Sequence, residues 1–230
     1  LYVLEDNGFP LIVGLKNVEM FKFLCDVVDN NRKNVILLEG NHERWLNKWG
    51  HDEPVQSEEF ANYTRPQLFK AGIDHNTARK VYSRVGQCSY FDYDEKRYFV
   101  SHGGLSYLPE FLPFVSTDQM VKGVGRYPDM LTVAESWEKS MPDSYIQIFG
   151  HRNVQDVPID MGHRCYNLEG KIEFGGYLRC VELEHGQSIK CVETKNDVFR
   201  KEEPKTETAV EMKTEFDNAE LVSKMRQSKY

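Results

Sequence analysis

The apolar positions in the first forty residues change from a helical to a strand pattern. Asn17 precedes apolar residues at helical spacing, which predicts a capped helix that ends near Asn30. The uninterrupted apolar run from Val35 to Leu38 predicts a buried strand ended by Gly40. A crossover helix that leads into a buried strand is typical of an α/β sheet.

The following sixty residues predict inserted helices and then a β-hairpin. Polar residues between Arg44 and Gly72 are interspersed with apolar ones, among them Trp45 and Trp49. These two indoles, four residues apart, fit a base-stacking wall, but helix packing is the favoured interpretation. Further on, a turn near Asp94 and Glu95 predicts a hairpin whose second strand leads to His102.

The carboxyl-terminal half predicts one helix and then mainly strands. The helix is expected from Leu131 to Ser140, within an otherwise irregular segment, and a strand is expected from Tyr145 to Phe149. Three short alternating runs separated by glycines then predict a closing β-meander. They are Cys165 to Glu169, Lys171 to Phe174 and Tyr177 to Glu184.

Three of the predicted strands end in polar residues that suit a metal site. Asn41 and His42 follow the first strand, while His102 and His151 follow two later ones, 61 and 49 positions apart in sequence. We expect these strands to converge at one sheet edge. An Asn carbonyl oxygen binds a divalent metal without adding charge, and an adjacent His can donate a proton. The pattern indicates metal-assisted ester cleavage, although Gly-Asn-His-Glu alone also fits a polar turn.

These three motifs resemble those of calcineurin-like metallophosphoesterases. The similarity is to the branch of phosphoprotein phosphatases and related bacterial, phage and nucleic-acid-repair enzymes. It implies an α/β fold, a β-sandwich flanked by helices, and a two-metal centre. The resemblance makes Asn41, His102 and His151 ligands of one metal and His42 the general acid. Glu43 is the expected partner that orients His42, and Arg44 and Arg152 are candidate phosphate contacts, with solvated surface positions as the alternative.

Two further motifs of that family, Asp-x-His and Gly-Asp-x-x-Asp-Arg-Gly, are absent. Gly14 stands 27 positions before Asn41, and counting back from it puts Phe9 and Ile12 where two carboxylates belong. Asp6 replaces the bridging carboxylate only if the loop is rearranged. We therefore expect an amino-terminally truncated domain, or a gene read with a frame error, that binds at most one metal ion.

Three functions follow from this incomplete motif set. One is an active phosphatase for phosphomonoesters on protein Ser or Thr or on polynucleotide ends. The others are a binding remnant with half a metal site, and a scaffold without metal. Oxygen and imidazole ligands suit Mn²⁺ first, with Fe or Zn²⁺ as alternatives.

Composition indicates a folded protein of the cytoplasm. The net charge of −7 gives no global attraction to nucleic acid, so a polynucleotide substrate needs a local basic patch. The chain has no apolar run of ~20 residues, from which we expect no membrane association. Five scattered cysteines predict free thiols in a reducing compartment.

We predict one metallophosphoesterase domain over residues 1–192, a charged linker over 193–216 and an amphipathic helix over 217–230. Resemblance to fused phosphatases implies that the helix leads to a nucleic-acid-repair module, such as a kinase or ligase. Docking back onto the same domain is the alternative.

Overall fold

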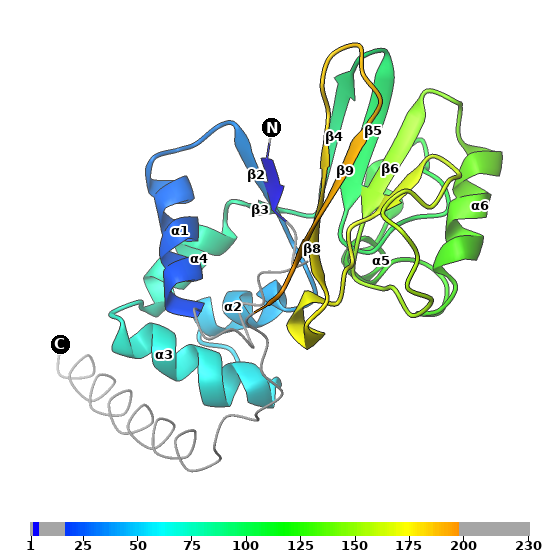
Figure 1. Cartoon of the computed structure of the whole chain (residues 1–230). Coiled ribbons are helices and arrows are strands. Elements are labelled where there is room, and N and C mark those ends of the chain that lie inside the picture. Colours follow the sequence, from blue (N-terminus) through cyan, green and yellow to red (C-terminus); the bar gives the residue numbers. More distant parts are fainter. Residues whose placement is uncertain (1, 5–16, 198–230) are drawn as a thin grey trace, which may run out of the picture. The chain divides into compact units, whose positions relative to one another are not determined.

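The computed structural model describes residues 2–4 and 17–197, which form two compact units (Figure 1). Each unit is described by itself. The described residues of the first unit are 2–4, 33–41 and 85–197, and those of the second unit are 17–32 and 42–84. Helices and sheets together confirm the predicted α/β class.

The helices of the second unit surround one apolar core. They are α1 (Asn17–Asp29), α2 (Glu43–Gly50), the π-helical turn η1 (Phe60–Thr64), α3 (Arg65–Lys70) and α4 (His75–Tyr82). Trp49 is buried in this core and meets Phe60 edge-on, and Trp45 packs against the same cluster. These contacts confirm the predicted helices and the helix-packing interpretation of the two indoles.

The first unit contains a parallel three-stranded sheet in the order β1-β2-β3. Its strands are β1 (Tyr2–Leu4), β2 (Val35–Leu38) and β3 (Val85–Gly86). Leu37 lies opposite both Leu4 and Val85, so β2 is the central strand. The predicted buried strand is confirmed, whereas its two short neighbours have too few residues to show a period.

A second sheet of the same unit has the order β4-β5-β6-β7 (Figure 1). The predicted hairpin is formed by β4 (Cys88–Tyr93) and β5 (Lys96–Ser101). Asp94 and Glu95, at φ 47° and 61°, form its two-residue turn, as expected for a tight hairpin. Strands β6 (Tyr145–Phe149) and β7 (Cys165–Asn167) continue the sheet in parallel.

Apolar side chains cover both faces of this four-stranded sheet. On one face, Phe99 and Phe149 pack with Trp137 of α6 (Met130–Ser140) and with Met120 of α5 (Thr117–Lys122). The opposite face carries Tyr98, Val100, Ile146 and Ile148, which pack with Leu38 of β2 and with Val181, Leu183 and Ile189. Helix α6 was predicted, but α5 lies in a segment predicted to be irregular.

The predicted β-meander is wrong. Strand β7 belongs to the four-stranded sheet, residues Ile172–Phe174 form a 3-10 helix (η3), and β8 (Tyr177–Glu182) pairs with β9 (Lys190–Lys195). Lys171 and Gly175 flank η3 in the left-handed region, at φ 55° and 82°, which interrupts the extended backbone that a strand needs.

Strand β9 also extends three residues into the predicted linker, 193–216. The linker from residue 198 onward and the predicted helix 217–230 lie outside the described residues.

All five cysteines lie in the described part of the chain, and all are free thiols, as predicted. Within residues 2–4 and 17–197, no helix has the length and apolar character needed to cross a bilayer.

Candidate metal site and adjoining pocket

Three predicted metal ligands of the first unit lie together. His102 is 1% exposed, and its Nε2 lies 3.0 Å from Asn41 Oδ1 and 3.2 Å from His151 Nδ1. The two imidazole rings are 4.8 Å apart between centroids and are tilted by 51°. The amide oxygen of Asn41 and one ring nitrogen of His151 therefore both lie close to the Nε2 atom of His102.

The three residues follow strand ends, as the sequence predicted. Asn41 lies just beyond β2, His102 directly follows β5, and His151 lies just beyond β6. Strands β5 and β6 are parallel neighbours, but β2 belongs to the other sheet of the unit. The expectation of a single sheet edge is therefore wrong, because Leu38 of β2 packs into the apolar core on a face of the second sheet instead of pairing with it.

The spacing of the three donor atoms fits a divalent cation. Metal–donor bonds of about 2.1 Å place neighbouring donors about 3.0 Å apart in an octahedral site and about 3.4 Å apart in a tetrahedral one. The observed 3.0 and 3.2 Å fall in this range. Among the described residues, no group of three or more His, Cys, Asp or Glu side chains is placed to hold a metal ion. The candidate metal site therefore needs the Asn41 amide oxygen as its third ligand, beside His102 and His151.

His151 has a strained backbone. Its φ is 69°, and the Arg152 N–H donates to the Gly150 carbonyl at 2.8 Å, which closes a three-residue γ-turn. A γ-turn whose central residue has positive φ is rare and strained, and such strain persists only where the surroundings hold it.

Every residue of this γ-turn is held by a hydrogen bond from outside it. The Gly150 N–H donates to the His102 carbonyl at 2.9 Å, which ties the two predicted ligands together. The Tyr127 hydroxyl donates to the His151 carbonyl at 2.9 Å, and the Asn167 side-chain amide donates to the Arg152 carbonyl at 3.0 Å.

A pocket of about 370 Å³ opens beside His151. It is lined by Asp118, Gln119, Lys122, Gly123, Gly125, Tyr127 and His151. The Tyr127 ring stands edge-on to the His151 imidazole at 5.6 Å, and Lys122 forms an ion pair with Asp118 at 3.2 Å. A ligand in this pocket would meet one candidate metal ligand, one aromatic ring and a polar helix face.

The family profile of calcineurin-like phosphoesterases matches residues 7–190, which is most of the chain. The chain belongs to the calcineurin-like phosphoesterase family. Members of this family generally bind divalent metals, and membership supports a phosphoesterase function. No curated protein matches the chain. Among solved structures, the hypothetical protein PH1004 from Pyrococcus horikoshii OT3 matches with 13% identity and a TM-score of 0.48, over 85% of this chain and 74% of that one.

Arg152 is fully buried. Its guanidinium donates to the Val124 carbonyl at 2.8 Å and to the Arg126 carbonyl at 3.1 Å, and burial lowers its pKa. Arg152, a predicted phosphate contact, therefore binds two backbone carbonyls in this structure. Arg126 is 84% exposed and stands between the pocket residues Gly125 and Tyr127.

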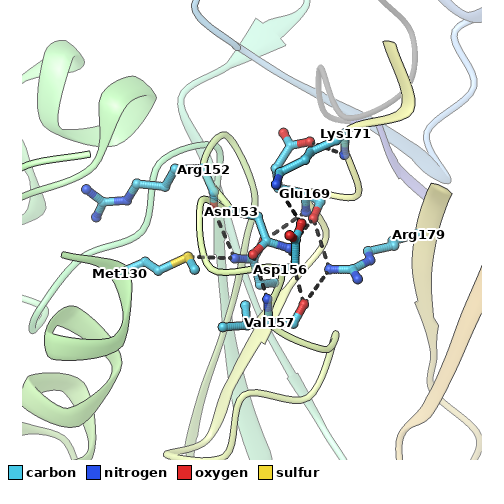
Figure 2. Close-up of polar contacts among 9 residues, drawn as sticks. Met130, Arg152, Asn153, Asp156, Val157, Glu169, Lys171 and Arg179 are labelled. Carbon is cyan, nitrogen blue, oxygen red and sulfur yellow. Dashed lines mark hydrogen bonds and ion pairs between the residues drawn. The ribbon is translucent and has the colours of Figure 1, made fainter. Parts of the chain in front are cut away.

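A second polar network fixes the segment that follows the γ-turn, and Figure 2 shows it beside Arg152, whose guanidinium points away from it. The Asn153 side chain accepts from the Val157 N–H at 2.7 Å and donates to the Val157 and Glu169 carbonyls. Arg179 donates to the same two carbonyls. Burial raises the pKa of the Glu169 carboxyl to about 7.

The remaining predicted site residues belong to the second unit. His42 precedes α2, whose first turn contains Glu43, which is 8% exposed, and Arg44. Burial, followed by the nearby Arg44 charge, lowers the pKa of His42.

Neither Tyr127 nor the γ-turn at His151 could be predicted from the sequence. A lone tyrosine in an irregular segment has no motif, and positive φ at a non-glycine residue leaves no trace in the hydrophobic pattern.

Proposed function

We propose that this chain is a metal-dependent phosphoric ester hydrolase that acts on phosphomonoesters. The observation that carries the proposal is that Asn41 Oδ1 and His151 Nδ1 lie 3.0 and 3.2 Å from His102 Nε2, distances that suit neighbouring ligands of one cation. Family membership supports the same reaction class. The pocket beside His151 offers space for the esterified group.

Asn41, His102 and His151 would hold the ion, for which Mn²⁺ is our first choice and Fe or Zn²⁺ the alternatives. A bound divalent cation supplies Lewis-acid stabilisation of charge on the phosphoryl oxygens and activates the attacking water. His42 directly follows Asn41 in the chain, and we assign it the proton donated to the leaving oxygen. Glu43 would orient His42.

Phosphate binding is assigned to Arg126, and Arg44 of the second unit stays a candidate because of its charge and its position after Glu43 in the sequence. Arg126 lies in the pocket-lining segment with its side chain exposed, whereas Arg152 is buried against backbone carbonyls. A guanidinium that donates hydrogen bonds to two carbonyls has fewer N–H groups left to bind a phosphate. Arg152 therefore keeps a phosphate role only if the loop over 124–126 opens.

For the substrate we propose either a phosphorylated Ser or Thr side chain, as in the phosphoprotein-phosphatase branch, or a phosphorylated polynucleotide end. The second substrate agrees with a fused or associated nucleic-acid-repair module in the cytoplasm. The pocket wall carries both Lys122 and Asp118, paired with each other, so it presents no strong net charge that favours either class.

A metal-binding module of low activity is the second candidate function. Phe9 and Ile12 occupy positions where the family pattern has carboxylates, and neither side chain has a donor for a metal. Without those carboxylates, the cation would be held by neutral ligands alone, which lowers its affinity.

The test is hydrolysis of p-nitrophenyl phosphate with Mn²⁺, combined with Mn²⁺ titration by calorimetry. His102→Ala should abolish both hydrolysis and binding, while His163→Ala, which removes a surface pair with Glu138, should change neither. Mn²⁺ binding that depends on His102, without hydrolysis, would favour the metal-binding module. A gain in hydrolysis rate in the double variant Phe9→Asp, Ile12→Asp would then show that the missing carboxylates cause the low activity. Equal Mn²⁺ binding by wild type and His102→Ala would exclude both candidates.

The substrate class is tested with the same preparation. A phosphoserine peptide and an oligonucleotide with a terminal phosphate should be compared by kcat/KM at equal Mn²⁺. A hundredfold preference for either identifies the class, and equal rates would exclude a dedicated substrate.

A further inference from the structure

The internal hydrogen bond of the γ-turn at His151 does not by itself fix the orientation of the His151 carbonyl. Its internal hydrogen bond uses the Gly150 carbonyl and the Arg152 N–H, so the carbonyl oxygen of His151 is left outside the ring that this bond closes. Rotation of His151 from its φ of 69° to the ordinary negative range would turn this carbonyl and swing the imidazole. A group that binds the carbonyl therefore also fixes the direction of the ring.

Tyr127 is that group, and it contacts His151 twice. Its hydroxyl donates to the His151 carbonyl at 2.9 Å, and its ring packs edge-on against the imidazole at 5.6 Å. The first contact holds the backbone, and the second limits rotation of the side chain. The His151 ring also contacts His102, with Nδ1 of His151 3.2 Å from Nε2 of His102.

Tyr127 is itself braced by the residue after His151. The buried Arg152 guanidinium donates to the carbonyls of Val124 and Arg126, which fixes the segment that leads into Tyr127. On the other side, the Gln155 side chain donates to the Pro128 carbonyl at 2.8 Å. The contacts close a ring from His151 through Arg152 to residues 124–126, on to Tyr127 and back to His151.

We propose that Tyr127 is a positioning residue for His151: it holds the strained γ-turn and so directs the imidazole toward Asn41 and His102. Tyr127 needs no contact with the cation or with the phosphate for this role. The inference rests on the proposed metal-binding function of His151, and it assigns to Arg152 the role of a brace for the Tyr127 segment.

The experiment separates the hydroxyl from the ring. Tyr127→Phe keeps the edge-on ring and removes the hydrogen bond, while Tyr127→Ala removes both. Tyr107→Phe is the matched control, because Tyr107 is 57% exposed and belongs to the same unit. In the full chain without metal, the ¹⁵N resonances of the His151 ring are measured by NMR and assigned from their loss in His151→Ala. Mn²⁺ dissociation constants are then measured for each variant.

Tyr127→Phe should shift or broaden the His151 ring resonances and weaken Mn²⁺ binding about two- to tenfold, the effect of one lost hydrogen bond. Tyr127→Ala should weaken binding further, and Tyr107→Phe should leave both measurements unchanged. Unchanged His151 resonances in both Tyr127 variants would overturn the inference, even if their melting temperatures fall. Because this readout needs no metal, it decides the role of Tyr127 even if the wild type binds no Mn²⁺, a result that counts only against the proposed function.

Discussion

Gly103 and Gly123 contact each other through their backbones, since a Cβ atom on Gly123 would lie 2.0 Å from the Gly103 carbonyl oxygen. Gly103 directly follows His102, and its N–H donates to the Met120 carbonyl of α5 at 2.8 Å. Gly123 ends α5 with φ 76°. The glycine after His102 thus allows α5, which contributes a wall of the pocket, to approach the candidate metal ligand.

Gly123→Ala should destabilise the first unit strongly. The new Cβ would meet the Gly103 carbonyl and lie 2.8 Å from Arg152 Nη2, in addition to the cost of positive φ. Gly162→Ala is the control, because Gly162 has φ 72° but no atom within 4 Å of an added Cβ. Urea unfolding should show a loss of about 1 kcal/mol for Gly162→Ala and about 3 kcal/mol or more for Gly123→Ala. Equal losses would mean that the close contact relaxes at no cost.

The sequence located the three ligands because each follows a strand with a clear apolar pattern. It did not reveal which strands pair. Period-two or continuous apolar runs identify a strand, but the sheet to which β2 belongs depends on β1 and β3, which have three and two residues. For this reason we predicted that the three strands end at one sheet edge, whereas they belong to two sheets. Leu38 of β2 packs in an apolar core with residues of the second sheet.

The missed elements are those set by local hydrogen bonds. Helix α5 has six residues and begins with a capping box between Ser116 and Gln119 in place of a long apolar stripe. Lys171 has a left-handed backbone conformation, and the residues after it form a 3-10 helix where a strand was predicted. The role of Tyr127 depends on a single hydroxyl-to-carbonyl bond, to which no residue pattern corresponds.

The two arginines near the pocket should respond differently to substitution. Arg152→Lys replaces a planar fork by one ammonium, which cannot serve both the Val124 and Arg126 carbonyls as well, so the free energy of unfolding should fall by about 2 kcal/mol. Arg126→Ala removes an exposed pair with Asp129 and should change stability by less than about 1 kcal/mol while raising KM for a phosphomonoester. Denaturant titration and steady-state kinetics measure both. A raised KM with unchanged stability in Arg152→Lys would instead support the predicted contact between Arg152 and the substrate phosphate.

Thiol labelling should divide the five cysteines by burial. Cys180 and Cys191 are exposed on the β8–β9 hairpin and should react with iodoacetamide first. Burial raises the pKa of the Cys165 thiol to about 12, which suppresses its thiolate, so Cys165 should be labelled only on unfolding. Peptide mapping after timed labelling gives the order, and early modification of Cys165 would show that the α6 face of the sheet opens in the native state.

Glu169 should make the stability of the first unit depend on pH. Its folded-state pKa, about 7, lies above the usual 4.5 because burial disfavours the charged carboxylate, while the Lys171 N–H and the Arg179 charge oppose this effect. A group with a raised folded pKa binds its proton more tightly in the folded state. Its contribution is therefore fully present below about pH 4.5 and is lost as the pH rises through about 7.

Urea unfolding between pH 5 and pH 8 should show this loss, at about 2–3 kcal/mol if the carboxylate stays buried. Glu169→Gln keeps the size and the acceptor for the Lys171 N–H but cannot ionise, so it should flatten the profile and gain its advantage over wild type at pH 8. Glu173→Gln removes a neighbouring carboxylate that also raises the pKa of Glu169, so it should lower this pKa and move the decline to lower pH. A decline that persists unchanged in Glu169→Gln would assign the pH dependence to other groups and indicate that Glu169 is solvated.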